Sequence, residues 1–175
     1  MSLDKFRFPI GDFKIPKDYN KQIIETWIND IRKFPSQIRK MVDVLSLEQL
    51  EKTYRQEGWS IIQVVNHCAD SHMNAFIRFK LALTEKLPII KPYEEAKWAE
   101  LSDGLLNNLN SSILLLKGLH SRWVFLLNSL SENDLKKCYY HPEHQKKIEL
   151  RVAIANYSWH CKHHLAHIEL AIKNR

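Results

Sequence analysis

Apolar residues recur every three or four positions in four long segments of the chain. These segments cover residues 18–45, 60–85, 105–130 and 149–173. The spacing places the apolar side chains on one face of a helix, so each segment is predicted to form an amphipathic helix. Pro35 lies inside the first segment and is expected to kink or interrupt that helix, because proline removes a backbone donor and crowds the preceding turn.

Shorter elements are predicted between the long helices. Ser46 and Ser131 are each expected to cap a short turn of helix. Residues 92–98 are expected to form another short helix that begins at a proline, and residues 139–144 a loop or a small hairpin. The first 16 residues contain prolines and a glycine between aromatic side chains, which predicts an extended, non-helical arm that packs on the body.

The length and composition fit a single helical domain spanning residues 1–175. A chain of this size can bury a continuous core without disulfides or a second domain. It contains only four glycines, so tight turns between strands are scarce and long helices are favoured. We therefore predict an all-α fold, a four-helix bundle with long crossover connections.

Charge and cysteine usage exclude several kinds of partner. The net charge of +6 comes from lysines and arginines scattered among acidic residues, without the basic stripe that nucleic-acid binding requires. No apolar run approaches the roughly 18 residues of a membrane span. The three cysteines have no CxxC spacing and there is no apolar leader, so we expect a reducing, cytoplasmic location without nucleic-acid or membrane partners.

Histidines carry the main chemical signal. The chain has nine, and four of them lie between residues 159 and 167. On a helix, His160 and His164 stand one turn apart on the same face, which is a spacing at which two imidazoles bind one ion. His67 on the second helix is the best placed third ligand. The alternative, that these histidines are hydrogen-bonded core or surface residues, stays open at this point.

Three neutral imidazoles would leave a metal ion its full double charge and an open coordination position, which favours activation of water or a thiol. Cys161 follows His160, so the HExxH arrangement of zinc proteases is absent. Asp70 is the candidate general base, and Asn74 and Arg78, which share the polar stripe of His67, are candidate substrate-binding residues. The remaining histidines are expected to be structural, with His72 in the core or supporting a ligand.

Several longer motifs occur in order along almost the whole chain. They are GWS at 58–60, HCADSHMNA at 67–75, RFKLALTE at 78–85, IKPY at 90–93, GLHSRW at 118–123, HPEH at 141–144 and the histidine-rich segment 159–169. Together these motifs resemble the YfiT branch of the DinB-like superfamily. The resemblance implies a four-helix bundle, usually a homodimer, with one zinc or nickel ion bound by three histidines that map onto His67, His160 and His164.

The resemblance also implies an activity on a small molecule. Relatives are classed as metal-dependent hydrolases, whereas other DinB-like proteins are S-transferases that use low-molecular-weight thiols such as bacillithiol, mycothiol or glutathione. We expect a metal-dependent enzyme of one of these two kinds. The lack of an acid or base at a fixed place after His160 favours thiol transfer, because an ionised thiol needs no general base. The alternative is a non-catalytic metal-binding module of a stress response.

Overall fold

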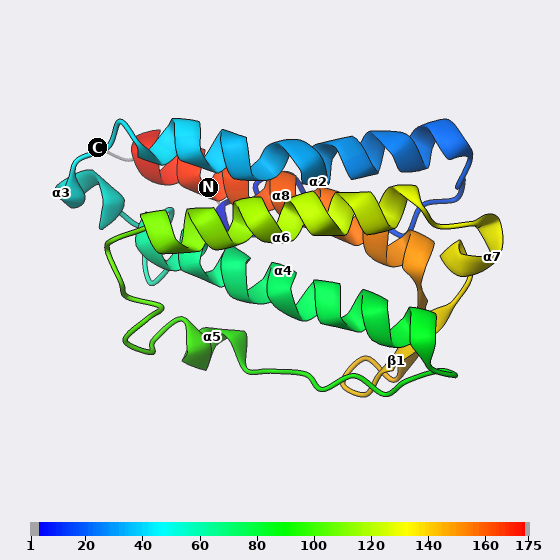
Figure 1. Cartoon of the computed structure of the whole chain (residues 1–175). Helices are drawn as coiled ribbons and strands as arrows, with labels where there is room; N and C mark the ends of the chain where they lie inside the picture. The colour runs from blue at the N-terminus through cyan, green and yellow to red at the C-terminus, as the bar shows by residue number, and fades with distance from the viewer. Residues whose placement is uncertain (1–3, 174–175) are drawn as a thin grey trace.

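The computed structural model describes residues 4–173, and most of them are helical. Four long helices form a bundle (Figure 1), namely α2 (Lys21–Val42), α4 (Ile61–Thr84), α6 (Asn110–Asn128) and α8 (Leu150–Lys173). Both α2 and α4 pack on α6 and α8, so α2 and α4 occupy opposite corners and the chain crosses the bundle between them. This confirms the predicted all-α four-helix bundle with long crossovers. That residues 1–175 form one domain stays a prediction, and residues 1–3 and 174–175 lie outside the described part.

The start of α4 follows from its local sequence. The Ser60 hydroxyl accepts the Gln63 backbone N–H, and the Gln63 side chain accepts the Ser60 backbone N–H. This capping box satisfies two backbone donors that a helix end would otherwise leave without partners. It fixes the first turn of the helix that carries His67, with the apolar face of the helix buried in the core.

Short elements connect the long helices. The helices α3 (Leu47–Leu50) and α7 (Glu132–Leu135) begin at the predicted serine caps. Of the two alternatives for residues 139–144, the hairpin is the one found, because β1 (Cys138–His141) pairs antiparallel with β2 (Lys146–Glu149). The helix α5 (Glu95–Trp98) is shorter than predicted, and Pro92 lies outside it.

The connection between α4 and α6 runs along α4 and joins the hairpin. The Tyr140 backbone N–H donates to the Pro88 carbonyl at 2.9 Å, and the Ile90 N–H donates to the Tyr140 carbonyl at 3.1 Å. Farther along, the Asn66 side-chain amide donates to the carbonyls of Gly104 and Leu106 at 3.0 and 3.1 Å. Because these carbonyls bond to α4, the chain stays irregular here, and α6 begins at Asn110 rather than near residue 105 as predicted.

The N-terminal arm differs from the prediction in its first turn. It was expected to be extended throughout, but Asp4–Arg7 form the one-turn helix α1. The extended preference that Pro9 imposes starts at the residue before it, so nothing local prevents a turn at residues 4–7. The rest of the arm packs on α8 as predicted, with the Trp159 indole N–H donating to the Gly11 carbonyl at 3.1 Å.

Pro35 does not interrupt its helix, contrary to one of the expected outcomes. The helix α2 runs without a break from Lys21 to Val42, and Pro35 is buried within it. Proline removes the N–H that would bond to the carbonyl four residues earlier, which belongs to Ile31. That carbonyl instead accepts from the His120 ring nitrogen Nδ1 at 2.6 Å. The lost helical bond is therefore replaced by one from a neighbouring helix.

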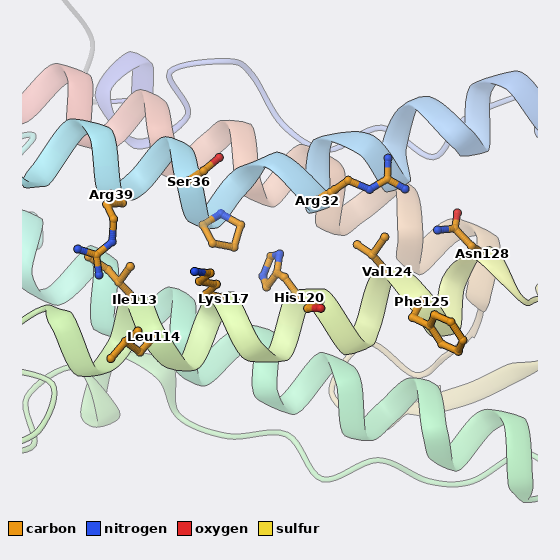
Figure 2. Close-up of a pocket in the computed structure, with 12 residues that line it drawn as sticks. Arg32, Ser36, Arg39, Ile113, Leu114, Lys117, His120, Val124, Phe125 and Asn128 are labelled. Atoms are coloured by element: carbon orange, nitrogen blue, oxygen red, sulfur yellow. The ribbon is translucent and has the colours of Figure 1, made fainter.

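A groove of about 710 Å³ separates the exposed edges of α2 and α6. Figure 2 shows His120 projecting from α6 towards α2, between Lys117 and Val124 on its own helix. The His120 side chain is only 2% exposed, so it belongs to the buried floor of the groove. Among the described residues no helix combines the length and apolarity that crossing a membrane requires.

Candidate metal centre

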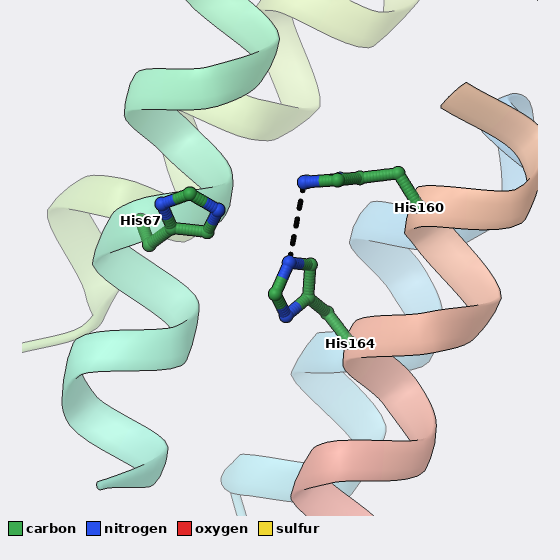
Figure 3. Close-up of side chains that lie close together, drawn as sticks. All are labelled: His67, His160 and His164. Carbon is green, nitrogen blue, oxygen red and sulfur yellow. Dashed lines mark hydrogen bonds between the residues drawn. The ribbon is translucent and has the colours of Figure 1, made fainter. Parts of the chain in front are cut away.

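Three imidazole rings meet between two facing helices. His67 projects from α4, and His160 and His164 project from successive turns of α8 (Figure 3). Each ring offers one nitrogen, and the three nitrogens all lie within 4.8 Å of one another. The Nε2 atoms of His160 and His164 are 3.2 Å apart. The structure thus brings together the three histidines that the sequence selected as metal ligands.

Burial keeps these imidazoles neutral. His67 and His164 are each 5% exposed, whereas His160 is partly exposed where it borders a cavity. Burial, with His167 nearby, lowers the pKa of His67 from 6.5 to about 4. Burial also lowers the pKa of His160 and His164 well below 6.5, and neighbouring imidazoles add to the effect. At neutral pH each ring therefore has a nitrogen lone pair to offer a cation.

The geometry fits a divalent ion of the zinc type. Two imidazole nitrogens bound at about 2.0–2.1 Å in a tetrahedral site lie about 3.3 Å apart. The 3.2 Å between the Nε2 atoms of His160 and His164 matches this edge. Imidazole is a good ligand for zinc and nickel alike, so the donor set suits both.

Other histidines surround the three. His72, which is fully buried, places its Nε2 3.0 Å from the His160 Nδ1. Its own Nδ1 lies 2.7 Å from the His120 Nε2. On the other side, the His167 Nδ1 lies 3.3 Å from the His164 Nδ1, and the His167 Nε2 donates to the Arg7 carbonyl at 3.1 Å. Each α8 ligand is therefore contacted by another imidazole on the side away from the group.

A second set of ligand atoms, from His163, His164 and His167, also lies within 4.8 Å. Both ring nitrogens of His167 are already engaged, one with the Arg7 carbonyl and one with His164. We therefore interpret His167 as a support for His164. His163 stacks on Trp159 with ring centroids 4.4 Å apart.

A cavity of about 1180 Å³ opens beside the group. Its wall includes His160, the Tyr157 ring one turn earlier on α8, and Ser71 and Arg78 from α4. The Tyr157 hydroxyl donates to the Ser71 carbonyl at 3.5 Å, and burial raises the pKa of Tyr157. The connection after α4 and the hairpin also line the cavity, through Tyr93, Tyr139 and His141. The cavity therefore gives access to the imidazole of His160.

Comparison with known proteins places the chain in a family. The model of the DinB superfamily matches residues 30–168, which is most of the chain. This chain belongs to the DinB superfamily. Curated relatives in Bacillus cereus and Bacillus anthracis are 48% and 47% identical over 166 residues, cover 95% of each chain, and carry the name "Putative metal-dependent hydrolase".

A solved structure is also similar. YfiT from Bacillus subtilis superposes with a TM-score of 0.92 at 42% identity, covering 95% of both chains. It is described as "a probable metal-dependent hydrolase with an unusual four-helix bundle topology". The resemblance to the YfiT branch of the DinB superfamily is thereby confirmed, and homologues of the chain carry the name of metal-dependent enzymes.

The structure separates the three other candidate residues of this DinB-superfamily chain. Arg78 lines the cavity. Asn74 is half-buried and donates from its amide to the Asp70 carbonyl at 2.9 Å. Asp70 is half-buried, and burial together with Asp103 raises the pKa of its carboxyl to about 6. Within residues 4–173, the Asp70 carboxyl does not join the group of ligand atoms formed by the histidines. Its role as a base stays a prediction.

Sequence reasoning missed the involvement of His120. It was expected to be merely structural, since it has no partner at a helical spacing, yet it contacts His72 deep in the bundle. One signal was available, because a proline inside a helix leaves a carbonyl that some other donor must satisfy when it is buried. His72, expected in the core or beside a ligand, occupies both roles. Cys161 is buried as predicted, and burial raises the pKa of its thiol.

Proposed function

We propose that this protein is a metal-dependent enzyme acting on a small molecule, with one zinc or nickel ion held by His67, His160 and His164. The observation that carries the proposal is the convergence of three neutral imidazoles beside a cavity that His160 itself lines. When bound by three imidazoles, such an ion retains its double charge and lowers the pKa of a thiol or water. The names of the relatives support metal dependence.

The surroundings of the group favour thiol transfer as the reaction. Among the described residues, no aspartate or glutamate oxygen lies with the three imidazoles in the group of ligand atoms. Hydrolysis usually uses a nearby base to accept a proton from water, whereas a thiol that is already ionised attacks an electrophilic carbon without one. Hydrolysis is the second candidate, because the relatives are named hydrolases, and Asp70 would then be the base.

Arg78 supports a substrate that carries a carboxylate. The guanidinium lines the cavity, and within residues 4–173 it forms no ion pair with a carboxylate of the chain. The Tyr157 side chain lines the same cavity. Arginine binds a carboxylate through two parallel N–H donors, so we propose a low-molecular-weight thiol with a carboxylate, of the bacillithiol type. Asn74, one turn earlier, is proposed as a secondary polar contact.

We further propose a cytoplasmic homodimer. All three cysteines are free, which supports a reducing compartment. The exposed side of α6 presents large apolar side chains, including Leu114 and Phe125, which is 80% exposed. An exposed apolar patch of this kind often marks a protein interface. Light scattering coupled to size exclusion tests the dimer, and a monomeric mass at micromolar concentration would refute it.

Metal binding is tested first. Protein purified without a histidine tag is loaded with zinc or nickel, desalted and measured by mass spectrometry for metal content. We expect about one ion per chain, lost in His160→Ala. The matched control is His144→Ala, which removes an exposed imidazole outside the group and is expected to retain the metal. Wild-type protein without bound metal would refute the proposal.

Thiol transfer and hydrolysis are then separated with the loaded protein. Monochlorobimane is offered with bacillithiol, mycothiol or glutathione, and nitrophenyl esters are offered without thiol. We expect conjugation with at least one thiol, abolished in His160→Ala. Ester cleavage without thiol, lost in the same variant while no conjugation occurs, would assign hydrolysis instead. Metal binding with neither reaction would favour the non-catalytic module.

A further inference from the structure

A chain of hydrogen bonds between buried imidazoles links α2 to the metal centre. The His120 Nδ1 lies 2.6 Å from the Ile31 carbonyl oxygen. The His120 Nε2 lies 2.7 Å from the His72 Nδ1, and the His72 Nε2 lies 3.0 Å from the His160 Nδ1. Ile31, His120, His72 and His160 come from α2, α6, α4 and α8, so the chain joins all four long helices.

The direction of every bond follows from its first member. A carbonyl oxygen only accepts, so the His120 Nδ1 must carry the proton. A neutral imidazole has one N–H, which makes the His120 Nε2 an acceptor for the N–H at the His72 Nδ1. By the same rule, the His72 Nε2 accepts the N–H at the His160 Nδ1. His72 and His120 are 0% and 2% exposed, and a buried imidazole without a carboxylate partner is neutral. The His160 Nε2 is thereby left with a lone pair.

Pro35 explains why the series of hydrogen bonds begins at the Ile31 carbonyl. An ordinary residue at this position would donate its backbone N–H to the Ile31 carbonyl within α2. Proline has no such N–H, and Ile31 is fully buried, so the carbonyl requires a donor from another element. His120 is that donor, and the 2.6 Å contact is the shortest of the chain.

A second, shorter series of hydrogen bonds fixes the tautomer of His164 in the same way. The His167 Nε2 lies 3.1 Å from the Arg7 carbonyl and must carry the proton. The His167 Nδ1 then accepts the N–H at the His164 Nδ1, 3.3 Å away. His160 and His164 are therefore each left with a lone pair on Nε2. These two Nε2 atoms lie 3.2 Å apart, and neither carries a proton. Two facing lone pairs repel, and a cation between them removes the repulsion.

We propose that Pro35, His120 and His72 are positioning residues that hold His160 as its Nδ1–H tautomer and so aim its Nε2 lone pair at a divalent metal ion. This rests on the proposed function only in requiring that the three-histidine site binds metal. Without the chain, His160 would move its proton to Nε2 and donate to His164. Metal binding would then have to displace that proton and would leave the buried Nδ1 of His160 without a partner, so affinity would fall.

The tautomers are read in the metal-free protein, which keeps this test independent of metal binding. Protein labelled with ¹⁵N-histidine is examined at pH 7.5 by long-range ¹H–¹⁵N correlation, which distinguishes protonated from unprotonated ring nitrogens. We expect Nδ1–H for His160, His72 and His120. In His72→Phe we expect His160 to change to Nε2–H. In His72→Gln we expect Nδ1–H to persist, because the glutamine carbonyl can accept in place of the His72 Nε2.

Zinc affinity is then measured by competition with a chromophoric chelator. We expect His72→Phe to bind zinc roughly 10–100-fold more weakly than wild type, as is usual when a partner of a metal-bound histidine is lost. His72→Gln should stay within about threefold of wild type, which a purely space-filling role would not explain, since phenylalanine fills the site better. His141→Phe is the control, because it replaces a buried histidine that takes no part in these hydrogen bonds.

Pro35→Ala tests the first hydrogen bond of the series, between Ile31 and His120, without altering any imidazole. It also keeps the inference testable if His72→Phe does not fold. The new N–H competes for the Ile31 carbonyl, so we expect zinc affinity between those of His72→Gln and His72→Phe. An Nε2–H tautomer of His160 in wild type, or equal zinc affinity in wild type, His72→Phe and Pro35→Ala, would overturn the inference. Wild-type protein that shows the assigned tautomers but binds no zinc would instead refute the proposed function.

Discussion

Acid should destabilise the metal-free protein partly through a single imidazole, His120. Its side chain is 2% exposed, and it stacks against Phe34 with ring centroids 5.8 Å apart. Burial lowers the pKa of His120 from 6.5 to about 4, although its bond to the Ile31 carbonyl acts in the opposite direction. Between these two pH values the unfolded chain binds the proton and the folded protein does not. The free energy of unfolding must therefore decrease as the pH falls from 6.5 towards 4.

The magnitude follows from the two pKa values. A difference of one pKa unit corresponds to about 1.4 kcal/mol. At pH 4.5 the unfolded imidazole is almost fully protonated and the folded one largely neutral, so His120 alone should lower the free energy of unfolding by about 2.5 kcal/mol relative to pH 7.5. Stability is retained in full above pH 6.5. The other buried histidines act with the same sign. Their contribution is common to wild type and His120→Phe except at His72, whose pKa His120 helps to lower, so losing His120 further reduces the acid sensitivity of the variant.

The assay compares wild type with His120→Phe in excess chelator. Urea unfolding is followed by far-ultraviolet circular dichroism at pH 7.5, 6.0 and 4.5. We expect the loss between pH 7.5 and 4.5 to be smaller in His120→Phe by about 2.5 kcal/mol, because phenylalanine cannot take up a proton. His144→Phe, which makes the same replacement at an exposed site, should match wild type. Equal losses in wild type and His120→Phe, within about 0.5 kcal/mol, would refute the reasoning.

Three other predictions concern the cavity, a helix cap and the arm. Arg78→Ala should raise KM for a carboxylate-bearing thiol by about tenfold or more with a smaller change in kcat, whereas exposed Arg122→Ala should change neither; equal KM values would exclude a carboxylate contact. Ser60→Ala should lower the free energy of urea unfolding by about 1 kcal/mol through loss of the capping box. Trp159→Phe removes the bond to the Gly11 carbonyl and should speed tryptic cleavage of the arm, and an unchanged cleavage rate would contradict this.

Local sequence signals accounted for the helices whose ends are decided locally. The Ser60 cap predicted the start of α4, and the apolar spacing predicted the extent of α8 to within one residue. The start of α6 could not be predicted, because it depends on Asn66 of another helix bonding to the carbonyls of Gly104 and Leu106. Periodicity describes one helix at a time and contains no information about such contacts.

In the candidate site, too, local patterns predicted some residues and could not predict others. That His160 and His164 share a face follows from the turn of a helix, and the polar stripe on α4 pointed to His67. The supporting imidazoles could not be found in this manner, because His120 and His72 meet across helices. Pro35 was expected only to kink or interrupt its own helix. In the structure, the Ile31 carbonyl that it leaves without a helical donor accepts from His120 instead.

The three candidate ligands lie on α4 and α8, with all of α6 and the hairpin between them in the sequence. An unfolded chain therefore cannot assemble the site locally, and any ion held there reports that the whole bundle is closed. A bound ion would stabilise the folded state, since each tenfold increase of free metal above its dissociation constant adds about 1.4 kcal/mol to the free energy of unfolding. The supply of free metal would then govern the lifetime of the protein as well as its chemistry.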